Sequence, residues 1–565
     1  MIGVRGEHIH ERWLRHGLSI AAIGVTVVLI GAACGGGSSS SSGSSSSSVA
    51  GAKLAQAGGP GEGPYPWLYP ASGGVHSGTG TTVSGTPCSS GTPQFPSPYA
   101  PPCLPKFTAS NGGATSNGVT GDKILLAERV FPSTANSQAV AAEARNAGAA
   151  LPQVSDQVQQ VFLNYFNKVY ELYGRHVVIQ NVTATGNITS ESLNQGQAQA
   201  CADADTIANQ VHAFGEAGLI NNFLGGGTGP FSTCAAQQKL VEFQGNPYFD
   251  EGSNQKTNPY VWNIAEDCER ISTQAAQVFS KYLTGKPAVY AGDADLKTKV
   301  RKLGTYIPNN PPYQHCAQVY LNALTNQYHV PADQVNTAFN YGLDISTFQQ
   351  SAQQAILQFK AAGVTTVLLA CDPFSAEFLT KAAAAQNYHP EWLLNGAALT
   401  DLDQTGQTYD QSEVTGHLFG MSEAAPSVDT TGPNSLAGKL YQQLTGHEIP
   451  AGTDGNYGLL VTMFNALQAA GPNLTPDNLA RGVHALAALG APNYEYGKWD
   501  YNSGPSGQAG SGDHTAISDA RFVYWDGKTT SALNGKQGTY VALFGGKRFA
   551  LGDWPAQLPP LFTGG

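Results

Sequence analysis

The stretch DISTFQQSAQQAILQFKAAGVTTVLLACDP, residues 344–373, decides the fold expected for this chain. Its first half is predicted to be a helix, and TTVLLA, residues 365–370, is a continuous apolar run. Such a run is typical of a strand that helices cover on both faces. The stretch therefore predicts a helix followed by a buried parallel strand. The apolar side chains that share one helix face at the required spacing are Phe348, Ala352, Ala355, Ile356, Phe359 and Ala362.

The same alternation of helix and strand extends in both directions from this stretch. It indicates an α/β fold with two Rossmann-like lobes, each a parallel sheet flanked by helices. Before residue 268 we expect strands at 122–130, 176–182, 219–226 and 247–252, with helices at 152–173, 201–214 and 231–244. After it we expect helices at 269–283, 314–327 and 375–386, with strands at 287–293, 335–341 and 391–396.

The N-terminus has the pattern of a secretory signal: a basic start, a short apolar run over 18–30 and small residues before Cys34. The run is short for a membrane span, which needs about 20 residues. It resembles a bacterial lipoprotein signal, in which residues 1–33 are removed and the cysteine thiol is acylated. An ordinary signal peptide or a signal anchor is the alternative. Either way, we expect the folded part to lie outside the cytoplasm, and with lipidation it is anchored to the membrane through Cys34.

Residues 34–117 are rich in Gly, Ser and Pro and lack apolar periodicity. We expect them to form a mostly disordered tether, part of which can lie against the folded domain. The 565-residue chain has a formal net charge of −11. This charge argues against a nucleic-acid partner and against a polybasic contact with anionic lipid.

Seven cysteines remain once Cys34 is set aside, so one thiol is free or pairs with another molecule. Outside the cytoplasm we expect disulfides. Cys88 and Cys103 flank a segment rich in Pro and Ser and are expected to close a local loop. The pairing among Cys268, Cys316 and Cys371 stays open at this point.

The chain shows no motif for catalysis or for a metal. GxSxG, HExxH and zinc-type Cys/His spacing are absent from the sequence. Asp293 and Asp295 have a Ca²⁺-like spacing without the rest of a calcium loop. Cys371 lacks a motif that would supply a base, so we interpret it as structural. We therefore expect neither an enzyme nor a cofactor.

Several stretches carry a resemblance to a known family. Taken in order, they resemble an ABC-transporter substrate-binding protein of the branched-chain amino-acid (Leu/Ile/Val) type, with the type I periplasmic-binding-protein fold. Besides the opening stretch they are GVTGDKILLAERV (118–130), GGGTGPFSTCAAQQKLVE (225–242), NPYVWNIAEDCERISTQAAQVF (258–279), DGNYGLLVTMFNALQAAG (454–471) and ARFVYWDGK (520–528).

The resemblance implies two lobes joined by a three-stranded hinge, with a small polar solute captured between them for ABC permease subunits. The solute would be amino-acid-like, an amide or a carboxylate. The resemblance also implies a disulfide between Cys201 and Cys234. Mapped onto this chain, it divides the sequence into lobe 1 (118–267 plus 423–500), lobe 2 (268–422 plus 501–550) and a tail (551–565).

In an open α/β sheet, ligands bind beyond the carboxyl ends of the strands. The loop of Gly226, Gly227 and Thr228 matches the family's ligand-carboxylate loop, and a tight turn is its alternative reading. Asp372 could bind an amine or cap the following helix. No acid stands at the Gly396–Ala397 position, which argues against an ordinary α-amino acid. The remaining candidates are Asp250, Glu251, Gly252, Ser253, Asp293, Leu296 and Phe374.

Two other functions fit the same sequence. A ligand-sensing or adhesive surface lipoprotein would explain a long tether with its own cysteines. A secreted hydrolase would have to use Cys371 or Asp372.

Overall fold

The fold consists of two parallel α/β lobes, as the sequence predicts. The computed structural model describes residues 77–132, 138, 152–192, 195–218, 229–244, 251–372, 374–396, 399–423, 432–490, 496–502 and 513–562. Cys34 and the signal segment lie outside the described residues.

The first lobe is built on a four-stranded parallel sheet in the order β4-β3-β5-β6. The aromatic side chains of α2 pack with α14 on one face of this sheet, and α4 and α5 cover the other face. The strands are β3 (Lys123–Val130), β4 (His176–Thr183), β5 (Gly215–Glu216) and β6 (Val241–Glu242). The helices are α2 (Pro152–Val169), α3 (Ile188–Ser192), α4 (Gln197–Asn209), α5 (Gly229–Gln237), α6 (Glu251–Thr257), α13 (Leu436–Thr445), α14 (Gly455–Ala469) and α15 (Pro476–Ala485).

Strands β5 and β6 come earlier in the chain than the sequence pattern predicts. We expected a helix over 231–244, but α5 ends at Gln237. Lys239 then adopts a positive φ of 61°, which turns the chain back so that Val241 enters the sheet beside Gly215. The apolar residues that suggested more helix are therefore the fourth strand. The expected strand at 219–226 lies outside the described residues, and so does most of the one at 247–252.

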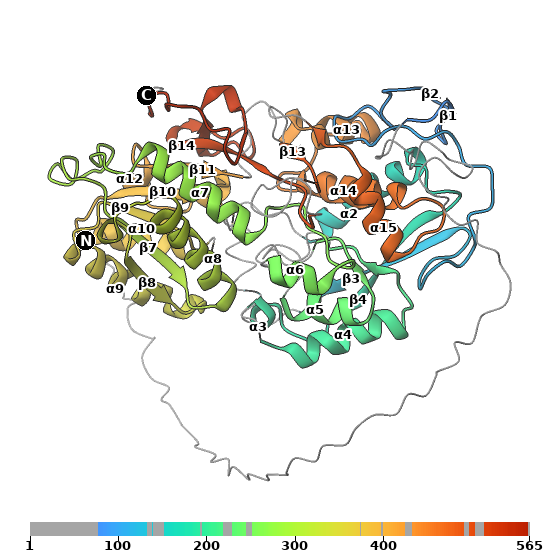
Figure 1. Cartoon of the computed structure of the whole chain (residues 1–565), viewed down its shortest axis with the longest axis horizontal. Helices are drawn as coiled ribbons and strands as arrows, with labels where there is room; N and C mark the ends of the chain where they lie inside the picture. The colour runs from blue at the N-terminus through green and yellow to red at the C-terminus, as the bar shows by residue number, and fades with distance from the viewer. Residues whose placement is uncertain are drawn as a thin grey trace, which may run out of the picture. The chain divides into compact units, whose positions relative to one another are not determined.

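The second lobe contains an eight-stranded sheet in which five parallel strands are followed by antiparallel ones. Helices α9 and α10 pack on one face, and α7 and α8 on the other (Figure 1). The strands are β7 (Leu303–Pro308), β8 (Thr337–Tyr341), β9 (Thr366–Leu369), β10 (Glu391–Asn395), β11 (Leu418–Ser422), β14 (Asp519–Thr530), β15 (Gln537–Ala542) and β16 (Phe549–Ala550). The helices are α7 (Cys268–Tyr282), α8 (Pro311–Asn322), α9 (Phe348–Ala361), α10 (Ser375–Ala385), α11 (Asp403–Gly406) and α12 (Gln411–Val414).

The stretch over residues 344–373 forms the helix and strand that its pattern predicts. Helix α9 buries Phe348, Ala352, Ala355, Ile356 and Phe359 against the sheet. Strand β9 is buried along its whole length. It lies between β7 and β10, in the interior of the sheet, which is why its run of apolar residues is unbroken.

The expected strand at 287–293 is not a strand. Residues after α7 form turns, and Pro287 makes a single isolated bridge with Val300. The first strand of this lobe is β7, ten residues beyond the predicted one. Glycine and aspartate over 292–295 favour turns over a strand.

Three crossovers connect the lobes and form the hinge. The first runs through residues 261–267, the second leaves β11 at Glu423, and the third runs through residues 513–518. The first and third pair in parallel at Asn263 and Thr515. Two further hydrogen bonds join them, from Ala516 N to Asn263 O at 3.1 Å and from Ile517 N to Ile264 O at 2.9 Å.

Residues 77–117, here called the N-terminal strap, are packed rather than a free tether, which corrects the sequence prediction. Phe95 and Tyr99 belong to the same buried cluster as α2 and α14. Gln94 Nε2 also donates to the carbonyl of Val169, at the end of α2, at 2.8 Å. An irregular strap inserts its aromatic side chains one at a time, so no helical or strand periodicity marks it. The strap includes β1 (Gly80–Thr81) and β2 (Pro87–Cys88).

Three disulfides are present among the described residues. Cys88 pairs with Cys103 inside the strap, as expected from the sequence. Cys201 pairs with Cys234 and joins α4 to α5, as the family resemblance implies. The undecided set resolves into a Cys268–Cys316 disulfide between α7 and α8, and Cys371 is a free, buried thiol.

Candidate ligand-binding site

The carboxyl edge of the second sheet contains three of the residues predicted from the sequence. Asp372 and Phe374 follow β9, and Gly396 follows β10, its parallel neighbour. The carboxyl ends of parallel strands meet at one edge, so these residues lie on the same side of the sheet. Gly396 has a φ of +82°, and a Cβ there would come within 3.1 Å of the backbone nitrogen of Glu423. Glycine is therefore required where the chain turns out of β10.

The carboxylate of Asp372 is held by groups of its own lobe. One oxygen accepts hydrogen bonds from the backbone nitrogens of Phe374 at 2.9 Å and Ser375 at 3.0 Å, at the start of α10. The other accepts from the hydroxyl of Tyr341, at the end of β8. Asp372 is 5% exposed. Of the two roles left open by the sequence, the structure shows the capping of α10.

Two stacked tyrosines stand behind this carboxylate. The rings of Tyr306 and Tyr341 are 4.1 Å apart and tilted by 9°. Burial raises the pKa of both phenols, so they stay protonated and act as donors. The hydroxyl of Tyr341 also contacts Ser375 Oγ at 2.7 Å. Cys371 lies in the same cluster, and burial raises the pKa of its thiol, which disfavours the nucleophilic thiolate.

Replacing Asp372 with asparagine tests the capping role. We expect the free energy of unfolding to fall by about 1.5–3 kcal/mol, because hydrogen bonds to a charged, buried acceptor are lost. Denaturant unfolding measures the change. Asp344→Asn is the matched control, since Asp344 accepts from Ser346 N at an exposed helix start and should cost less. Equal costs for the two variants would contradict the role of buried charge.

The structure separates Asp293 and Leu296 from the other candidates. Asp293 Oδ2 accepts from the backbone nitrogen of His389, which precedes β10, at 3.0 Å. These two residues therefore lie at the amino edge of the sheet, opposite to the expected side. Their placement beyond a strand end depended on the strand at 287–293, which does not form.

The candidates of the first lobe lie mostly outside the described residues. This holds for Gly226, Gly227, Thr228 and Asp250, and also for Ala397 of the second lobe. Glu251, Gly252 and Ser253 form the first turn of α6. The glycine-containing loop after β5 leads directly into α5, which begins at Gly229. The arrangement of a loop followed by a helix N-terminus, which suits a carboxylate, is thus retained in the chain order.

Sequence reasoning did not single out Arg129, at the end of β3. It is 2% exposed, and its guanidinium bonds Glu191 Oε1 at 2.8 Å and Asp203 Oδ2 at 2.7 Å. It also lies over the ring of Phe231 in α5, 4.0 Å from the centroid. The cluster joins β3 to α3, α4 and α5. The signal was present in LLAERV, where two charged residues interrupt an otherwise apolar strand.

A second missed feature is a pair of glutamates at the ends of β5 and β6. Glu216 and Glu242 are direct partners in the parallel register, and both are buried. Burial raises the pKa of Glu216 to about 7 and that of Glu242 well above its ordinary value. The pair is therefore at least partly protonated at neutral pH. Strands this short give no periodicity, so the sequence could not show that these residues meet.

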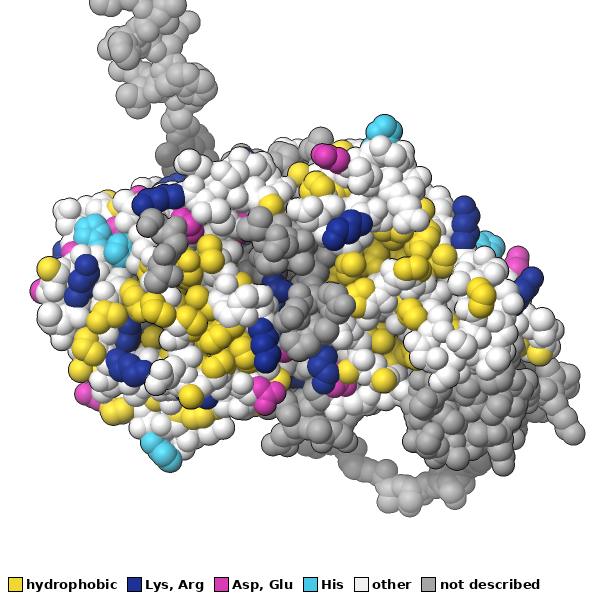
Figure 2. All heavy atoms as spheres, turned by 90° about the horizontal axis from the view of Figure 1, so that it is seen from above, with side chains coloured by type: hydrophobic (Ala, Val, Ile, Leu, Met, Phe, Trp, Pro, Cys, Tyr) yellow, Lys and Arg dark blue, Asp and Glu magenta, His cyan; other side chains and the backbone are white. Residues whose placement is uncertain are grey.

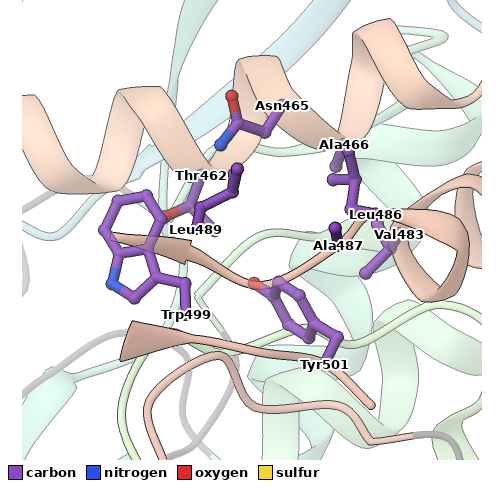
Figure 3. A pocket seen from close by; sticks show the side chains of 9 residues that line it. All are labelled: Thr462, Asn465, Ala466, Val483, Leu486, Ala487, Leu489, Trp499 and Tyr501. Carbon is purple, nitrogen blue, oxygen red and sulfur yellow. The ribbon is translucent and has the colours of Figure 1, made fainter. Parts of the chain in front are cut away.

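A small cavity lies within the first lobe, away from the sheet edges. It is enclosed by α14, α15, β12 (Leu489–Gly490) and β13 (Lys498–Trp499), with Trp499 and Tyr501 facing it (Figure 3). Its volume is about 20 Å³. That volume holds roughly one water molecule and is too small for a metabolite.

The described surface offers no support for other ligand classes. On the face seen in Figure 2, Lys and Arg side chains are scattered singly or in small groups. One set of described residues has metal-ligand spacing, namely Cys268, Glu269 and His315, and its cysteine is held in a disulfide. Within the described part of the chain, no helix combines the length and apolar character needed to cross a membrane.

Comparison with known proteins gives matches among solved structures alone. No family model and no curated protein matches the chain. A fatty acid ABC transporter substrate-binding protein from Thermomonospora curvata is 14% identical, with a TM-score of 0.50 over 79% of this chain and 97% of that one. An ABC transporter substrate-binding protein from Sphaerobacter thermophilus is 10% identical, with a TM-score of 0.50 over 77% and 100%.

This chain has the type I periplasmic-binding-protein fold. The resemblance noted in the sequence is confirmed at this level, because many similar structures are substrate-binding proteins of ABC transporters. One of them is the branched-chain amino acid transporter substrate-binding protein of Streptococcus pneumoniae, 11% identical, with a TM-score of 0.47 over 74% of this chain and 100% of that one. Identities this low establish the periplasmic-binding-protein fold and leave the solute to be inferred.

Proposed function

We propose that this chain is the solute-binding component of an ABC importer, working outside the cytoplasm and held at the membrane by a lipid on Cys34. It acts by closing two lobes on a small solute, without a covalent step. The observation that carries the proposal is the pair of parallel-sheet lobes joined by three crossovers. Hinge closure around a ligand is the motion that such an arrangement allows.

The solute we propose is a small carboxylate or amide without an ammonium group. Asp372 was the acid best placed to bind an amine, and its oxygens are occupied by Phe374 N, Ser375 N and the Tyr341 hydroxyl. In the first lobe, a glycine-rich loop precedes the N-terminus of α5. Backbone N–H groups at a helix start favour a negatively charged group.

The alternatives lose their specific motives in the structure. The cysteine pair of the N-terminal strap is part of a packed segment, so it does not single out a sensing or adhesive role. Cys371 is buried, and its raised pKa opposes nucleophilic attack. Asp372 is occupied as a cap.

Thermal unfolding of the full chain in detergent, with a panel of metabolites, tests the proposal. Carboxylates and amides should raise Tm, and the matched α-amino acids should not. A ligand at about one hundred times its Kd adds roughly 2.7 kcal/mol to the free energy of unfolding. Small-angle scattering should then show a smaller radius of gyration with the same compound.

Two outcomes would contradict the proposal at different levels. If α-amino acids alone raise Tm, the solute class is wrong and the binding function stands. If no compound changes either Tm or the radius of gyration, the binding function itself fails.

A further inference from the structure

The three crossovers are joined by acidic side chains. Glu423, where the second crossover begins, accepts a hydrogen bond from the backbone nitrogen of Glu266 in the first, at 2.8 Å. Glu266 is 3% exposed, and neither of its carboxylate oxygens has a hydrogen-bond partner. Two glutamates from different crossovers therefore meet in a buried place.

Both nearby arginines already bind other groups. Arg270 forms a salt bridge with Asp513 of the third crossover and donates to the carbonyl of Ile517 at 2.9 Å. Arg548 bonds Asp519 Oδ1 at 2.7 Å and donates to the carbonyl of Glu423. The arginines hold the crossovers together without contacting the carboxylate of Glu266.

The charges around the pair do not balance. Burial is the main cause that raises the pKa of Glu266 well above its ordinary value, and it raises the pKa of Glu423 from 4.5 to about 7. An unpaired buried carboxylate is costly, and a proton is the simplest way to remove its charge. The charged groups that face the two glutamates are Asp267, Arg270, Asp401, Asp519 and Arg548.

A bound metal ion would be the other way to neutralise these acids. Three ligand atoms close enough for one ion occur, in the described chain, at Cys268, Glu269 and His315. Glu266 and Glu423 do not form such a set with Asp267 or Asp519. The geometry therefore favours a proton over a divalent cation.

We propose that the crossovers form a proton-linked hinge, in which the arrangement seen here keeps a proton on the Glu266–Glu423 pair and loosens when that proton is lost. This inference goes beyond the proposed solute binding and concerns the chain without its solute. Its consequence for function is that closure, and with it solute affinity, depends on the pH outside the cell.

The direction of the effect follows from linkage. A glutamate with a raised pKa binds its proton more tightly in the folded arrangement than in a loosened or unfolded one. Its stabilising contribution is complete below the ordinary value of 4.5 and is lost as pH rises through about 7. The hinge should therefore be firm under mildly acidic conditions and loosen on the alkaline side of neutrality.

Hydrogen–deuterium exchange of the full chain without solute provides a local test. After correction for the intrinsic exchange rate, protection of residues 261–270 and 513–519 should fall roughly tenfold between pH 6 and pH 8, the effect of one proton lost about one unit above its pKa. Glu266→Gln and Glu423→Gln should each remove most of this pH dependence. Strands β9 and β10 should show little of it.

The matched control is Glu377→Gln, because Glu377 pairs with Lys381 on the exposed side of α10, away from the crossovers. It should leave the profile of the wild-type chain unchanged. Equal pH profiles in wild type and both hinge variants would overturn the proposal. So would protection at pH 8 that is restored by Ca²⁺ or removed by a chelator, which would assign the acids to a cation. Neither result bears on whether a solute binds.

Discussion

Replacing Arg129 with methionine is expected to lower the free energy of unfolding by about 3–5 kcal/mol, because two buried carboxylates lose their cation. The side chains of Glu191 and Asp203 are almost fully inaccessible and both bond the guanidinium. Methionine fills similar space and cannot offset their charge. Urea unfolding followed by circular dichroism measures the loss.

A combined variant separates charge from packing. Adding Glu191→Gln and Asp203→Asn to Arg129→Met removes the whole ionic cluster and should recover at least half of the loss. Arg481→Met, at an exposed position of α15, is the control and should stay within about 0.5 kcal/mol of wild type. If Arg129→Met behaves like this control, the buried cluster does not stabilise the first lobe.

Tyr99→Ala should be about as damaging, at roughly 3–5 kcal/mol, although it lies in a segment that looks like a linker in sequence. Tyr99 is fully buried, and its ring lies 4.3 Å from that of Trp499. Its hydroxyl donates to the carbonyl of Gly497 at 2.8 Å and accepts from the backbone nitrogen of Tyr496 at 2.9 Å. The substitution removes all of these contacts and leaves a hole in the core.

Two milder substitutions in the strap calibrate this result. Tyr99→Phe keeps the ring and loses the hydroxyl bonds, so about 1–2 kcal/mol is expected. Val83→Ala, at a side chain that is 39% exposed, should cost less than about 0.5 kcal/mol. Denaturant unfolding distinguishes the three. A Tyr99→Ala chain as stable as Val83→Ala would mean that the strap does not belong to the first lobe.

The parts of the fold with regular periodicity could be predicted from the sequence. Helix α9 and strand β9 show why: a long amphipathic helix and an unbroken apolar run each give a repeated signal. Strands β5 and β6 give none, because two residues each suffice where neighbouring strands supply the rest of the sheet. The strap was missed for a related reason, since single aromatic residues such as Phe95 and Tyr99 pack without any repeat.

The candidate site was predictable where a strand was predicted correctly. Asp372 and Gly396 follow β9 and β10, and the structure places both at the carboxyl edge. Asp293 was misplaced because its strand was. The role of Asp372 depends on which donors surround it, and the Tyr341 hydroxyl is brought there from another strand. Sequence spacing contains no information on such a meeting.

Neither core is made from one continuous piece of chain. The first includes Phe95 from the strap, Phe464 of α14 and Ile517 of the third crossover, and the second sheet needs β14 and β15 to complete its edge. During synthesis, a nascent chain cut off from its last hundred residues would have neither core finished. An exported polypeptide of this design stays threadable through a secretion channel until almost its whole length has been made, and folds afterwards.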